Sequence, residues 1–178
     1  SEIQFYDTHL FDTELLVASG SGRQIVLRKY RGVEFGFDLS NPRQVTLTAG
    51  FDVASLHIGP RNQWIYAIGH TGDIEIFGVG SLSKPTRMYR GTLIQPGQKL
   101  TAVTLLLGRY SLVAATDDGT ITQFGIYTDA LGTRLDAIRQ FTLETPIRRF
   151  VTEPRRKGFM AVDAAGDIHL MYPTSGRQ

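Results

Sequence analysis

The 178-residue sequence predicts an all-β, β-propeller-like fold of about four four-stranded antiparallel repeats of ~47 residues. Three observations predict it: a recurring turn glycine, a constant apolar register around that glycine, and the absence of any segment with helical periodicity. Gly72, Gly119 and Gly166 are 47 residues apart, and Gly22 precedes the first of them by 50. Glycine adopts positive φ at low cost, so all four positions suit tight hairpin turns.

Apolar residues keep the same spacing on both sides of the turn glycines. Five sets recur at intervals of 47: Val53, Leu100 and Ile147; Leu56, Val103 and Phe150; Ile65, Leu112 and Phe159; Ala67, Ala114 and Ala161; Ile74, Ile121 and Ile168. A β-sandwich has no need of a constant register, whereas the repeated sheets of a propeller require one. The pattern therefore favours propeller blades.

Each repeat predicts short strands with period-two alternation, bounded by turn residues. The expected repeats cover residues 3–50, 53–97, 100–144 and 147–178. In the first, strands begin at Ile3, Glu14, Gln24 and, after an irregular insert, Gln44. In the second they begin at Val53, Gln63, Ile74 and Arg87, and in the third at Leu100, Tyr110, Thr120 and Leu135. The last repeat has strands at Pro146, Lys157 and Asp167 and lacks a fourth.

The incomplete last repeat predicts a single propeller-like domain over residues 1–178 that is a fragment of a larger ring. Four-bladed closure, with the missing strand supplied in another way, is the alternative. A fragment leaves one apolar face at each end, near Leu15 and near Phe159, and such faces tend to pair. We therefore expect closure within the chain or a dimer, and favour the dimer.

Composition narrows the classes of function. The net charge of +2 is too small to predict a nucleic-acid partner, and the absence of cysteine excludes disulfides and thiolate chemistry. The four histidines lack metal-ligand spacing, and the Gly20–Gln24 segment precedes a strand rather than the helix that a phosphate loop requires. We expect no catalytic, cofactor-binding or metal-binding residues and no enzyme activity.

A basic run follows the third repeat, comprising Arg148, Arg149, Arg155, Arg156 and Lys157. Charges at a strand-turn-strand are most simply a solvated blade edge. The functional alternative is an interaction patch for an acidic protein or for anionic lipid headgroups. Both interpretations stay open on the sequence alone.

Most of the chain resembles one protein family. The most specific segment is "PRRKGFMAVDAAGDI", Pro154–Ile168, supported by "LTAVTLLLGRYSLVAATDDGTI", "DVASLHIGPRNQWIYAIG" and, more weakly, "TELLVASGSGRQIVL". These segments resemble the extra-membrane region inserted after the first transmembrane helix of the enlarged permease subunits of bacterial phosphate-specific ABC transporters. The Trp-Asp mark of the best-known propeller repeats is absent.

The resemblance implies a soluble, non-catalytic interaction or regulatory domain that contributes to inorganic phosphate import. The parent would be a bacterial inner-membrane protein with this domain in the periplasm, joined to the membrane by helices outside this chain. Its partners would be the phosphate-binding protein, the second permease and, through the full-length protein, the ATPase. No site residues carry over from the family. The alternative is a free-standing propeller scaffold in an unrelated assembly.

Overall fold

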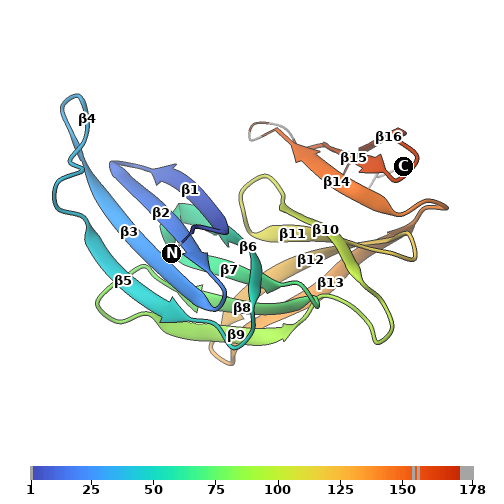
Figure 1. The fold of residues 1–178 in the computed structure, drawn as a ribbon, viewed down its shortest axis with the longest axis horizontal. Helices are drawn as coiled ribbons and strands as arrows, with labels where there is room; N and C mark the ends of the chain where they lie inside the picture. Colours follow the sequence, from blue (N-terminus) through green and yellow to red (C-terminus); the bar gives the residue numbers. More distant parts are fainter. Residues whose placement is uncertain (1, 154, 156, 173–178) are drawn as a thin grey trace. The chain divides into compact units, whose positions relative to one another are not determined.

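The computed structural model describes residues 2–153, 155 and 157–172, and it confirms the all-β, propeller-like fold class (Figure 1). The strands form four antiparallel sheets that follow one another along the chain. Sheet 1 contains β1 (Phe5–Phe11), β2 (Glu14–Ser21), β3 (Gln24–Val33), the short β4 (Gly36–Phe37) and β5 (Arg43–Thr48). Sheet 2 contains β6 (Val53–Ile58), β7 (Trp64–Gly69), β8 (Asp73–Gly78) and β9 (Thr86–Thr92).

The other two sheets lie in the second half of the chain. Sheet 3 contains β10 (Leu100–Leu105), β11 (Ser111–Thr116), β12 (Thr120–Asp129) and β13 (Gly132–Thr142). Sheet 4 contains β14 (Ile147–Thr152), β15 (Phe159–Asp163) and β16 (Ile168–Met171), three strands within the described residues. The chain divides into two compact units, residues 1–92 and 93–178, with two sheets each. Organisation as a single domain stays a prediction.

Sheets 1 and 2 pack face to face in the first unit. Because successive side chains of a strand point to opposite faces, alternate residues of each strand build the core between them. Sheet 1 contributes Leu16, Ala18, Ile25 and Leu27, all fully buried. Sheet 2 contributes Leu56, Ile58, Ile65, Ala67 and Phe77.

Sheets 3 and 4 pack in the same way in the second unit. Sheet 3 contributes Val113, Ala115 and Ile121, with Ala102 and Phe141 partly buried beside them. Sheet 4 contributes Ile147, Phe159 and Ala161, with Phe150 and Met171 partly buried. The rings of Phe150 and Phe159 meet edge to face, with centroids 5.6 Å apart.

Both units use the same faces for this contact. We call the face that packs on the following sheet the forward face, carried by Leu16 and Ala18 in sheet 1 and by Val113 and Ala115 in sheet 3. We call the face that packs on the preceding sheet the backward face, carried by Ile65 and Ala67 in sheet 2 and by Phe159 and Ala161 in sheet 4. Phe159 and Ala161 follow Ile65 and Ala67 by two intervals of 47 residues. The repeat therefore specifies which residues pack on the preceding sheet as well as which residues form strands.

Polar side chains also join sheet 1 to sheet 2. The repeat of apolar residues and glycines does not predict these hydrogen bonds. The carboxylate of Asp7 accepts a hydrogen bond from the backbone N–H of Ile58 at 2.7 Å. Asn62, buried in the turn η1 (Pro60–Asn62), receives a hydrogen bond from Nδ1 of His9 at 2.8 Å. Its own amide donates to the carbonyl oxygen of Glu14 at 3.3 Å. Asn62 adopts positive φ to reach these partners.

The four turn glycines have the positive φ expected of them. Their φ values are 57° for Gly22, 84° for Gly72, 84° for Gly119 and 94° for Gly166, each within the hairpin between the second and third main strands of its sheet. Their surroundings differ. A Cβ on Gly119 would collide with the carbonyl oxygen of Leu143, whereas a Cβ on Gly166 would meet nothing within 4 Å.

We expect Gly119→Ala to destabilise the chain by roughly 1 kcal/mol or more beyond the cost of Gly166→Ala. Both variants carry the strain of a side chain at positive φ, but only Gly119→Ala must also displace Leu143, whose N–H bonds to the Gly119 carbonyl at 2.9 Å. Urea unfolding of both variants measures the difference. Equal losses would show that the Leu143 segment moves aside freely.

Candidate interaction surface on sheet 4

The forward face of sheet 4 is apolar and open to solvent. Met160 of β15 pairs with Leu170 of β16 and Val151 of β14, and Val162 pairs with Ile168. The alternation of strand side chains puts these five residues on one face. Met160, Ile168 and Leu170 are 41%, 67% and 63% exposed, which is unusual for large apolar side chains in the middle of strands.

The equivalent positions of sheet 3 show what this face lacks. Val113, Ala115 and Ile121 precede Met160, Val162 and Ile168 by 47 residues and are at most 1% exposed. They belong to the core that sheet 3 forms with sheet 4. The two faces are equivalent in the repeat, but within the described residues a following sheet covers the sheet 3 face and none covers the sheet 4 face.

The structure specifies which residues of the terminal segment are exposed. The apolar face expected near Phe159 is carried by Met160, whereas Phe159 itself lies on the backward face and is 4% exposed. The exposed residue is its neighbour Met160, because adjacent residues of a strand point to opposite faces. Leu15, the residue expected at the other end, is half-buried.

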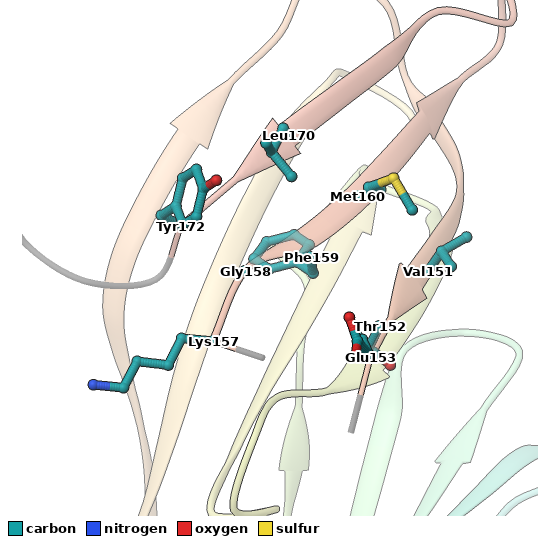
Figure 2. Close-up of a pocket in the computed structure, with 9 residues that line it drawn as sticks. All are labelled: Val151, Thr152, Glu153, Lys157, Gly158, Phe159, Met160, Leu170 and Tyr172. Carbon is teal, nitrogen blue, oxygen red and sulfur yellow. The ribbon is translucent and has the colours of Figure 1, made fainter. Parts of the chain in front are cut away.

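A hollow of about 560 Å³ opens beside the apolar residues (Figure 2). Its apolar lining comes from Val151, Phe159, Met160, Leu170 and Tyr172. The rest of the lining comes from Thr152, Glu153, Lys157 and Gly158. In Figure 2 the Lys157 side chain extends away from Met160 and Val151. The volume suits a small ligand or an inserted side chain.

The basic run does not form one compact patch. Arg148 and Arg149 are exposed near the start of β14, where the register with β15 shifts, whereas Arg155 and Lys157 are exposed beyond its other end. At about 3.3 Å per residue, the strand alone separates Arg149 from Thr152 by about 10 Å. Arg156 lies outside the described residues. The described cations therefore flank the forward face of sheet 4 at two ends.

Asp163 holds the β15–β16 hairpin that carries this surface. Its buried carboxylate accepts hydrogen bonds from the backbone N–H groups of Ala165 and Asp167 and from Nε2 of His169, each at 2.9 Å. The His169 hydrogen bond, followed by the two backbone N–H groups, lowers the pKa of Asp163 below its usual value. The sequence marks this aspartate as a turn residue but not its bond to a histidine six positions later.

Sheet 3 has a related carboxylate in its own turn. Asp118 accepts hydrogen bonds from the Thr116 hydroxyl and the Gln98 amide, each at 2.7 Å, and from the Thr120 N–H at 3.1 Å. These donors, the Thr116 hydroxyl first, lower the pKa of Asp118 well below its usual range. Both aspartates are therefore built into turns, consistent with the ordinary role of aspartate there.

Two features are absent from the described residues. No group of three or more His, Asp or Glu side chains there is arranged to hold a metal ion. No helix there is long and apolar enough to span a bilayer.

Comparison with known proteins supports the fold. No protein-family model and no curated protein sequence matches the chain. Among solved structures, it is similar to the β-propeller domain of Cps50 (Swd1) from Myceliophteria thermophila, with a TM-score of 0.65 at 12% sequence identity. The match covers 97% of this chain and 54% of that one, so this chain spans about half the length of that domain's chain. At this identity the likeness establishes a β-propeller fold.

The hydrogen bonds of Asp163 make stability depend on pH. Because the pKa of Asp163 is lower in the folded than in the unfolded chain, its contribution is complete above the ordinary value of 3.8. It is lost as the pH falls below 3.8 through the folded-state pKa. We expect urea midpoints to fall less between pH 6 and pH 3 for Asp163→Asn than for the wild type. Parallel declines would show that the carboxylate's charge is immaterial to the hairpin.

Proposed function

We propose that this chain is a non-catalytic interaction domain whose working surface is the forward face of sheet 4. One observation carries the proposal: Met160, Ile168 and Leu170 are 41–67% exposed, although Val113 and Ile121, which precede Met160 and Ile168 by one repeat, are at most 1% exposed. Contiguous exposed apolar residues on a rigid sheet are typical of protein-binding surfaces. The nearby hollow, lined by Tyr172 and Leu170, offers a recess for an anchoring side chain.

We further propose that the domain belongs to the enlarged permease subunit of a bacterial phosphate ABC transporter, on the periplasmic side of the inner membrane. The support is the resemblance of the segment Pro154–Ile168. That segment contains β15 (Phe159–Asp163) and the turn bound by Asp163, so the residues that carry the resemblance also build the surface. Its partners would be the phosphate-binding protein or the other transporter subunits.

The domain would contribute contacts rather than chemistry. Burial of apolar area is the dominant favourable contribution to most protein–protein association, so a sheet face with several exposed large side chains can hold a partner. Arg149 at one end of the face and Lys157 near the other would favour partners with acidic rims and speed their approach. Separate ATPase subunits would supply the energy for phosphate import.

A second candidate is a free-standing propeller scaffold in another assembly. It is favoured by the structural likeness to the propeller domain of Cps50 (Swd1), which extends over 97% of this chain. The full-length gene product discriminates the two. Transmembrane helices flanking this region favour the permease, and a product without them favours the scaffold.

We expect Leu170→Asp, introduced into the full-length permease, to lower phosphate uptake at least severalfold, because a charge in the forward face opposes burial against any partner. Leu131→Asp is the matched control, since Leu131 is 97% exposed in the turn between β12 and β13. Uptake of labelled phosphate by cells that express equal amounts of each variant is the measurement. Wild-type uptake by Leu170→Asp would contradict the proposal.

A further inference from the structure

The hairpin formed by β3 and β4 carries a second set of exposed apolar residues. It projects beyond the other strands of sheet 1 (Figure 1). Val33 pairs with Gly36, so Glu34 and Phe35 form the turn. Phe35 is 91% exposed, Leu39 is 67% exposed and Val33 is 52% exposed. Side chains this exposed contribute little to the core of the first unit, and neighbouring exposed apolar residues are typical of interaction sites.

Backbone hydrogen bonds hold the base of this hairpin. The N–H of Gly32 donates to the carbonyl oxygen of Thr13 at 2.6 Å, and the N–H of Asp38 donates to the carbonyl oxygen of Arg31 at 3.0 Å. A Cβ on Gly32 would lie 2.8 Å from the Thr13 oxygen, so glycine permits this close approach. The exposed tip is therefore presented on a base that is bonded to the rest of sheet 1.

A polar hollow of about 600 Å³ lies at the base of the hairpin, and Val33 contributes to its lining. The charged side chains that line it are three cations and two carboxylates: Lys29, Arg31, Arg43, Glu14 and Asp38. In the register of sheet 1, Glu14 pairs with Arg31 and Lys29 pairs with Arg43. These four residues share the forward face of sheet 1 with Val33, because alternate residues of a strand point the same way.

The hollow has one positive charge in excess, and its arginines face solvent. The Glu14 carboxylate lies 3.1 Å from Nζ of Lys29, which is only 7% exposed. The same carboxylate lies 4.0 Å from Nη2 of Arg43, whose side chain is 80% exposed. Arg31 is exposed as well. Because a guanidinium group presents several N–H donors in a plane, Arg31 and Arg43 suit the oxygens of a phosphate group.

We infer that the β3–β4 hairpin binds the surface of a phospholipid bilayer, with Phe35 inserted at the tip and a lipid phosphate in the hollow beside Arg31 and Arg43. The inference goes beyond the proposed function, since it concerns a different surface and does not depend on that function.

The order of side chains along the hairpin matches the order of layers in a bilayer. Apolar residues occupy the tip, and the cations follow toward the base. Arg31 comes two residues before Val33, about 7 Å along the strand. Interfacial segments insert their apolar groups about 5–10 Å below the headgroups, so the arginines would lie at the level of the phosphates.

The shape of the hairpin favours a bilayer over a protein partner. A stable protein–protein interface buries about 800 Å² on each side and needs a complementary surface. A projecting two-residue turn offers little area of that kind. A bilayer accepts a projecting apolar group of any shape, and anionic headgroups add attraction for each nearby cation.

The β12–β13 hairpin provides a comparison within the same chain. Its turn also exposes a large apolar residue, Leu131, which is 97% exposed. Arg134 beside that turn is held by two carboxylates, Asp129 at 2.8 Å and Asp136 at 2.9 Å, and lies 5.1 Å from the ring centre of Tyr127. The charge of this arginine is thus already compensated, whereas the cations beside the β3–β4 hairpin exceed the carboxylates.

Cosedimentation of the 178-residue chain with vesicles tests the inference. We expect binding to vesicles of equal parts phosphatidylglycerol and phosphatidylcholine, and weaker binding to pure phosphatidylcholine. Phe35→Ser should lower the partition coefficient on the mixed vesicles about tenfold, because the phenyl ring no longer transfers from water. Leu131→Ser, the same substitution in the β12–β13 turn, should bind as the wild type does. Urea midpoints show that both variants remain folded.

Two results would overturn the bilayer as partner. One is a wild type that does not sediment with the mixed vesicles. The other is a Phe35→Ser variant that binds them as tightly as the wild type, because the tip would then contribute nothing.

Charge variants test the hollow as the phosphate site. Arg43→Gln should weaken binding to the mixed vesicles about fivefold, because one cation near an anionic surface contributes roughly that factor. Glu34→Gln should strengthen binding, because the carboxylate beside Phe35 opposes anionic headgroups. Unchanged binding by Arg43→Gln would overturn the role of the hollow.

A fluorescent tip reports insertion directly. Phe35→Trp should show a blue-shifted emission on the mixed vesicles and quenching by lipids brominated on their acyl chains. Leu131→Trp should show neither, and both variants contain the same second indole, Trp64. An unshifted spectrum for vesicle-bound Phe35→Trp would mean that the chain binds by charge alone, which would contradict insertion of the tip.

Glycerol phosphate separates a lipid headgroup from a soluble phosphate ester. We expect the chain to bind this compound far more weakly than the mixed vesicles, because the soluble compound offers nothing to the Phe35 tip. Equal affinity of glycerol phosphate for the wild type and Phe35→Ser, without binding of either to vesicles, would assign the hollow to a soluble ligand. That result would replace the bilayer as the partner.

Discussion

A sheet that is apolar on both faces needs a neighbour on each side, and most features of this chain depend on that constraint. In both units the contact joins the forward face of one sheet to the backward face of the next. Packed sheets lie about 10 Å apart, so the facing side chains must interdigitate. Alanines at Ala18, Ala67, Ala115 and Ala161 sit among larger side chains in these contacts and make room for them. The need to pack each sheet on its neighbours therefore explains why apolar residues recur every 47 residues.

The polar contacts of the first unit add directional support to the same packing. Asp7, His9 and Asn62 link sheet 1 to the strand and turn that begin sheet 2, and Lys29, 7% exposed, donates to the carbonyl oxygen of Gly80 while pairing with Glu14 at 3.1 Å. A buried ammonium must be paired in this way, because desolvation without partners would be costly. Hydrogen bonds and ion pairs of this kind fix the orientation of one sheet on the other, because they are directional and apolar contacts are not.

Local features of the sequence were sufficient to predict strands and hairpins, and their recurrence at intervals of 47 residues predicted the fold class. Alternation of apolar residues and the φ preference of glycine act over a few residues, so Gly72 or Gly119 can be interpreted in isolation. The long-range choices could not be predicted in this way. Phe159 and Met160 are both apolar neighbours, and only the packing of sheet 4 on sheet 3 shows that one is buried and the other exposed. The hydrogen-bond partners of Asn62 and Asp163 could not be predicted from the sequence either, because they also depend on how the folded chain brings these residues together.

The central claim is that equivalent positions of the repeat differ energetically because a following sheet covers one and not the other. Ile121→Ala and Ile168→Ala test it most directly, since these isoleucines are 47 residues apart and 0% and 67% exposed. Urea unfolding should be measured at concentrations where the chain is monomeric. The account predicts a loss of about 2–5 kcal/mol for Ile121→Ala and less than about 1 kcal/mol for Ile168→Ala. Equal losses at the two positions would contradict it.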